Sequence, residues 1–135
     1  MKKTLLFLML LLVGVTYASA EKQAEITFDK TTHDFGKFSE DHPKVRCTFT
    51  FTNTGNAPLV INQAVASCGC TIPDFTKEPI MPGKKGTIEV TYNGAGKYPG
   101  EFKKSITVRS NAKIELLRLY IKGEMTPKTT KSANN

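Results

Sequence analysis

The three cysteines carry the most specific chemistry in this sequence. Cys68 and Cys70 flank Gly69, a residue that permits the backbone to bend between them. Two thiolates at this spacing are candidate ligands for a soft metal such as Cu(I). In an oxidising compartment the cysteines instead form a disulfide, either within the pair or from one member to Cys47. An odd number of cysteines leaves one thiol unpaired or engaged in an intermolecular bond. We favour the oxidised, structural pair, with Cys47 buried as a small apolar side chain.

Few other residues could complete a metal or catalytic site. His33 and His42 lie far from the cysteine pair in the sequence, and structural zinc usually takes four ligands. Met81 and Met125 are the only methionines beyond the N-terminal apolar segment, too few for a Met-rich copper site. No phosphate-binding loop, nucleophile elbow or His-Glu-x-x-His motif is present. We therefore predict no enzyme, no catalytic residue, no cofactor and no bound metal; Cys68 becomes a nucleophile only if the fold brings a histidine to it.

The N-terminal segment has the pattern of a secretory signal peptide. Two lysines precede an apolar run over residues 5–15, and small residues at Ala18 and Ala20 place the predicted cleavage before Glu21. The run is shorter than the roughly 20 residues that span a bilayer, which argues against a membrane anchor. No cysteine lies near the cut, so the sequence does not predict a lipoprotein. We expect a periplasmic or secreted protein with no transmembrane segment after cleavage.

The remainder of the chain alternates apolar and polar residues with period two, the pattern of half-buried strands. Over residues 45–53, Cys47, Phe49 and Phe51 share one face, and a slip of one residue would move threonines into the core. Lys104 has the parity of an inward residue in its strand, so we expect a bulge or a sheet edge there. The predicted strands cover residues 25–29, 34–38, 45–53, 59–65, 86–93, 102–110 and 114–123.

Seven short strands separated by turn residues predict an all-β fold. We favour a single antiparallel immunoglobulin-like β-sandwich, and a small β-barrel is the alternative fold. The expected organisation is a signal peptide over residues 1–20, a sandwich over 21–125 and a flexible polar tail over 126–135. With 39% hydrophobic and 23% charged residues, the chain is neither a disordered tail nor a multi-span membrane protein.

Several segments resemble an exported bacterial family known as domain of unknown function 1573. The segments lie at residues 49–61 (Phe-Thr-Phe-Thr-Asn-Thr-Gly and Pro-Leu-Val-Ile), 66–71 (with Cys-Gly-Cys-Thr), 82–90, 100–111 and 119–123. The Cys-Gly-Cys-Thr motif is the most specific of these. The family is related to the Ig-like domains of the ASPM, SPD-2, Hydin type, so the resemblance implies an Ig-like sandwich and supplies no catalytic residue.

The net charge of +7 is concentrated in one stretch of the chain. Residues 77–113 hold most of the basic excess, which could form a face for anionic lipids or for an acidic partner. We favour the simpler interpretation of a solvated surface with lysines protecting sheet edges. No nucleic-acid-binding module is visible.

We predict a non-catalytic exported domain that binds an unknown protein or an anionic envelope component. The alternatives are a thiol-dependent envelope protein that binds Cu(I) or exchanges disulfides through Cys68 and Cys70, and a structural module without a specific partner.

Overall fold

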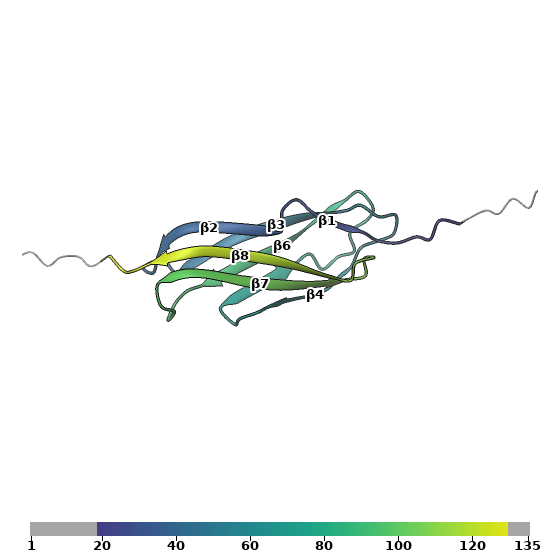
Figure 1. Ribbon diagram of the computed structural model, residues 1–135. Coiled ribbons are helices and arrows are strands. Elements are labelled where there is room, and N and C mark those ends of the chain that lie inside the picture. Colours follow the sequence, from purple (N-terminus) through teal and green to yellow (C-terminus); the bar gives the residue numbers. More distant parts are fainter. Residues whose placement is uncertain (1–18, 130–135) are drawn as a thin grey trace, which may run out of the picture.

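The computed structural model describes residues 19–129, and within this range two four-stranded sheets pack face to face (Figure 1). The sheets have the strand orders β1-β3-β6-β5 and β2-β8-β7-β4. Most of the predicted signal peptide and residues 130–135 of the predicted tail lie outside the described range. The strands are β1 (Ile26–Phe28), β2 (Thr32–Ser39), β3 (Lys44–Asn53), β4 (Ile61–Ala66), β5 (Thr71–Phe75), β6 (Lys85–Asn93), β7 (Gly100–Ser110) and β8 (Leu116–Thr126).

The core lies between the two sheets, and β3 supplies its centre. Phe49 and Phe51 are fully buried, and Cys47 is 7% exposed, as the alternation predicted. Phe49 lies opposite Ile88 of β6 in the antiparallel pairing. The facing sheet contributes alternate residues of β7 and β8, all nearly inaccessible to solvent: Ile106, Val108, Leu119 and Ile121. Two separate sheets with a shared apolar interior make the fold a sandwich rather than a barrel.

An eighth strand, β5, is absent from the predicted set. Pro73 lies in the middle of β5, and proline lacks the N–H that an interior strand must donate. β5 forms the edge of its sheet and pairs only with β6, so Pro73 interrupts no second ladder of hydrogen bonds.

The β2–β8 pair is parallel, which departs from the purely antiparallel sandwich that we expected. β1 and β2 run in the same direction but belong to different sheets, so the chain changes sheet without reversing (Figure 1). The Asp29 N–H donates to Thr50 of the first sheet, and the Thr31 carbonyl accepts from Tyr120 of the second. A strand that enters the second sheet in this direction pairs with β8 in parallel, not antiparallel.

Lys104 does not mark a bulge in β7. It pairs with Ile121 of β8 in an unbroken register. The pairing of β7 with β4 ends at Ile106, opposite Ala66, so Lys104 lies where one side of β7 has become an edge. Of the two expectations for this position, the edge is the correct one. At the C-terminal end of the sandwich, β8 continues through Thr126, which is the first residue of the segment predicted as a tail.

Candidate functional site

Cys68 and Cys70 form a disulfide with each other in the turn that carries the chain from β4 to β5. Their Cα atoms are 5.3 Å apart, within the range that a disulfide can bridge. Both residues are partly exposed, and Cys70 packs against the hydrophobic core. The turn therefore crosses between the two sheets and presents its sulfur atoms near the surface.

Backbone hydrogen bonds hold this turn independently of the disulfide. The Thr71 N–H donates to the Cys68 carbonyl at 3.1 Å, and the Asn93 N–H donates to the Cys70 carbonyl at 2.8 Å. On the β4 side, the Ser67 N–H donates to the Ser105 carbonyl at 2.9 Å. Both ends of the turn are thus fixed to the neighbouring strands β6 and β7.

Two donors also point at the sulfur atoms themselves. The Cys70 N–H donates to Cys68 Sγ at 3.1 Å. The Thr71 hydroxyl lies 3.8 Å from Cys70 Sγ, within hydrogen-bonding range of sulfur. Donors at these positions favour thiolates over thiols if the disulfide opens.

Gly69 lies in the bend between the two cysteines, as expected, but the bend does not use the conformational freedom that is special to glycine. Its φ is not positive, and a Cβ built there would meet no atom within 4 Å. A Cβ would therefore fit there without a clash with the surrounding chain. The effect of glycine here is to leave the surface beside the disulfide open.

Cys47 is separate from this pair. It is the free cysteine of the described residues, and it faces the core from β3, opposite Val90. Burial raises the pKa of its thiol from 9.0 to about 11, whereas nearby Lys30 acts in the opposite direction. Such a thiol is protonated and inert at neutral pH.

Among the described residues, no hydrogen bond joins His33 or His42 to Cys68 or Cys70, and His42 lies in the turn between β2 and β3. His33 lies on β2, which is the opposite edge of its sheet from β4. Its ring packs against Phe35, and burial together with Lys30 lowers its pKa, against a smaller effect of Asp34. Across residues 19–129, no three His, Cys, Asp or Glu side chains gather where they could hold a metal ion.

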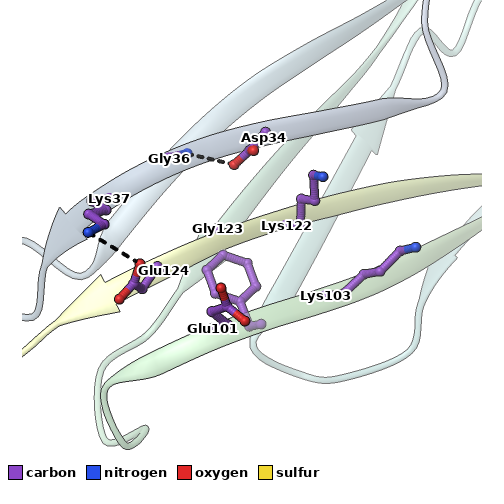
Figure 2. A pocket seen from close by; sticks show the side chains of 9 residues that line it. Asp34, Gly36, Lys37, Glu101, Lys103, Lys122, Gly123 and Glu124 are labelled. Carbon is purple, nitrogen blue, oxygen red and sulfur yellow. Dashed lines mark hydrogen bonds and ion pairs between the residues drawn. The ribbon is translucent and has the colours of Figure 1, made fainter.

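A second candidate site is a shallow groove of about 580 Å³ on the outer face of the β2-β8-β7-β4 sheet (Figure 2). Here two like-charged pairs lie directly opposite each other on β7 and β8. Lys103 faces Lys122, and Glu101 faces Glu124. The groove is lined by Asp34, Gly36, Lys37, Glu101, Phe102, Lys103, Lys122, Gly123 and Glu124.

Part of this charge is neutralised within the groove. Lys37 forms an ion pair of 3.8 Å with Glu124, as Figure 2 shows. The Lys103 ammonium lies over the Tyr120 ring, 4.7 Å from its centroid. No ion pair among the described residues includes Lys122 or Glu101. Like charges directly opposite each other on a sheet are destabilising. On the other side of β8, Asp34 and Lys37 of β2 lie opposite Lys122 and Glu124 and offset part of this repulsion.

The groove was not found from the sequence. The alternation of β7 and β8 identifies which lysines and glutamates face outwards, but the register between the two strands decides which of them are neighbours. The basic stretch over residues 77–113 does not form one face. Lys85 lies on the outer face of the first sheet, Lys103 on that of the second, and Lys97 in the β6–β7 loop.

A comparison with models of protein families identifies the family of this chain. The model of the family described as "Protein of unknown function (DUF1573)" matches residues 26–125. The chain belongs to this family. The matched region runs from the first residue of β1 almost to the end of β8, and so contains both the disulfide and the groove.

Solved structures share the fold at low sequence identity. A protein of unknown function from Porphyromonas gingivalis W83 superposes with a TM-score of 0.65 at 15% identity, covering 81% of this chain and 51% of that one. The ASH / PapD-like domain of human CEP192 gives 0.63 at 8%, covering 85% and 94%. The Vibrio cholerae VesB protease gives 0.56 at 17%, covering 74% and 31%. The chain thus spans about half of the P. gingivalis protein and a smaller part of the protease.

These likenesses show that the chain has the fold of an Ig-like β-sandwich. No curated protein matches the sequence. The part of the chain that the structure describes contains no helix long and apolar enough to span a membrane.

Proposed function

We propose that this protein is a non-catalytic exported domain that binds a protein partner through the outer face of its β2-β8-β7-β4 sheet. The observation that carries the proposal is the register of β7 and β8, which places Lys103 opposite Lys122 and Glu101 opposite Glu124. Lys122 and Glu101 form no ion pair among the described residues, although Asp34 lies opposite Lys122 on β2. A partner that presents an acidic and a basic group at the corresponding positions would match them.

The opposite sheet has a different surface. The outward residues of β3 and β6 are mainly threonines, among them Thr48, Thr50 and Thr87. Its principal charges, Arg46 and Glu89, form an ion pair with each other at 3.5 Å. Glu89 also lies opposite Asp74 on this face, but each of the two carboxylates has a basic partner, Arg46 or Lys77. Glu101 of the groove has none among the described residues, so the groove-bearing face is the better candidate for an interface.

The mixed charge favours a protein over a lipid surface. Anionic headgroups would be attracted to Lys103 and Lys122 but repelled by Glu101 and Glu124, which share the groove. An acidic partner without basic groups meets the same repulsion. A protein surface can place both signs of charge in register, and such matching also suppresses wrong partners.

Photocrosslinking tests the proposal in cells. A photoreactive residue at Lys103 should yield a discrete crosslinked protein, whereas one at Thr50, on the opposite sheet, should not. Lys122→Gln should weaken that crosslink by about tenfold, because one matched charge is lost. Lys85→Gln removes an equally exposed strand lysine from the other face and serves as the control. Equal crosslinking from both faces, or binding to anionic phospholipid vesicles in place of a protein, would refute the proposal.

The proposed location follows from the sequence of the leader. A cleaved signal peptide would deliver a chain that begins at Glu21 to the periplasm or the exterior, where a disulfide such as Cys68–Cys70 persists. Mass spectrometry of the protein purified from its native host should find this N-terminus. A chain that retains Met1 and stays in the cytoplasm would contradict the exported location. That result would not bear on the proposal that the groove binds a protein.

A further inference from the structure

We propose that Cys68 and Cys70 form a reversible thiol–disulfide exchange site that accepts two electrons from a dithiol of a partner protein. This site is separate from the groove and does not depend on the proposed binding function. It rests on the exposure of the bond, the donors at both sulfur atoms and the small structural contribution of the disulfide.

The disulfide adds little to the fold. It closes a ring with a sequence separation of two residues, and a loop this short restricts the unfolded chain only slightly. The turn is already fixed at both ends, by Asn93 binding the Cys70 carbonyl and by Ser67 binding the Ser105 carbonyl. Opening the bond leaves these hydrogen bonds in place, so the reduced protein should keep the same fold.

The bond is also open to attack. Gly69 is exposed and has neither a positive φ nor a neighbour that would exclude a side chain. Backbone geometry therefore does not require glycine, and the missing side chain at Gly69 leaves one flank of the disulfide uncovered. Cys70 packs against the core, which leaves Cys68 as the outer sulfur of the pair.

The exchange proceeds in two balanced steps. A thiolate of the partner dithiol attacks Cys68 Sγ; the Cys68–Cys70 bond breaks, and Cys70 leaves as a thiolate beside the Thr71 hydroxyl. The partner's second thiolate then attacks the partner's first sulfur, which is bonded to Cys68 in the mixed disulfide. This step expels Cys68 as a thiolate that the Cys70 N–H stabilises, and it completes a disulfide in the partner. The partner loses two electrons, and the cysteine pair gains them.

Cys47 takes no part in this chemistry. It is buried in β3, and its thiol stays protonated at neutral pH, so it neither resolves the mixed disulfide nor competes for the partner. The pair is therefore a self-contained two-electron site, and it can be titrated without replacing the third cysteine.

A redox titration tests the proposal directly. The full chain is equilibrated with mixtures of reduced and oxidised dithiothreitol, trapped with a maleimide and counted for thiols by mass spectrometry. Two thiols should appear together, in buffers no more reducing than those that half-reduce a reference thioredoxin, while circular dichroism stays native. Reduction only in stronger buffers, or only after the protein unfolds, would overturn the proposal.

Two sets of variants separate an exchange site from a structural bond. The variant Cys70→Ser keeps Cys68 together with its backbone N–H donor, and the variant Cys68→Ser keeps only Cys70. Cys68 in the first variant should react with glutathione disulfide about tenfold faster than Cys70 in the second. Gly69→Val should slow reduction by thioredoxin several-fold, leaving reduction by dithiothreitol and the urea midpoint unchanged. Equal reactivity of the two cysteines, or no effect of Gly69→Val on either reductant, would show that the bond is structural only.

Discussion

The side-chain amide of Asn53 donates a hydrogen bond of 2.8 Å to the carbonyl oxygen of Ile80, across 27 residues of sequence. A second bond of 2.7 Å reaches the Ala57 carbonyl, and the side-chain Oδ1 of Asn53 accepts from the Gly55 N–H at 3.0 Å. Asn53 is fully buried. It thereby joins the turn after β3 to the segment before β6, where Leu59 and Ile80 form an isolated bridge.

Removing this amide should therefore be costly. Asn53→Ala leaves the Ala57 carbonyl and the Gly55 N–H without their partner, and we expect a loss of about 2–3 kcal/mol in the free energy of unfolding. Asn56→Ala is the matched control, because its side chain accepts a hydrogen bond from the Gln23 N–H at an exposed site. That change should cost less than about 1 kcal/mol. Urea melts measure both, and equal losses would show that Asn53 is only a turn residue.

This asparagine illustrates which features the sequence could supply. Alternation over residues 45–53 predicted the inward face of β3 correctly, because a slip would have buried threonines in place of Phe49 and Phe51. The local pattern placed Asn53 at the end of the predicted strand over residues 45–53. Its role depends on Ile80, and that contact exists only after the two sheets have packed.

The other differences have the same origin. Pro73 breaks the local strand pattern, but β5 lies at an edge, a fact that belongs to the whole sheet. The parallel entry of β2 follows from the change of sheet after β1. For the candidate sites, the Cys68–Cys70 spacing was visible in the sequence, whereas the groove required the register that places Lys103 opposite Lys122.

The centre of the core provides a second test of stability. Phe49→Ala removes a fully buried aromatic ring and should cost about 3–5 kcal/mol. Thr50 is the next residue on the same strand and faces outwards, so Thr50→Ala should cost less than about 1 kcal/mol. Urea unfolding of the two variants compares the faces directly. Equally mild effects would contradict the register of β3.

Two glycines should respond in opposite ways to the same added methyl group. A Cβ on Gly86 would collide with the ring of Phe51, so Gly86→Ala should destabilise the protein by about 1–3 kcal/mol. Gly69 has open space and no positive φ, so Gly69→Ala should be neutral or should stabilise by up to about 1 kcal/mol. Thermal and urea melts report both changes. A large loss at Gly69 would mean that the turn requires glycine for its conformation.

The buried thiol of Cys47 should make stability depend on pH in the alkaline range. Its pKa is raised by burial from 9.0 to about 11, so above pH 9 the unfolded state loses the proton that the folded state retains. The contribution is complete below pH 9 and is lost as the pH rises to 11. It amounts to about 3 kcal/mol over that interval.

Other groups titrate in this range, and burial also raises the pKa of Tyr92. The difference between the wild-type chain and Cys47→Ala isolates the thiol. The variant will be less stable at neutral pH because it loses packing in the core, and that gap should narrow between pH 9 and 11. Urea melts at a series of pH values measure it; a gap that stays constant would place Cys47 in contact with solvent.

Loss of the Cys68–Cys70 disulfide should have a small effect on stability. The double variant Cys68→Ser/Cys70→Ser should lose clearly less than the roughly 3 kcal/mol expected for a disulfide that closes a 15-residue loop. The hydrogen bonds from Asn93 and Ser67 hold the turn in either case. The single variant Cys47→Ser serves as the comparison, because it places a hydroxyl in the core and should cost more than the pair does. A loss of 3 kcal/mol or more in the double variant, measured by urea unfolding, would make the disulfide a main support of the fold.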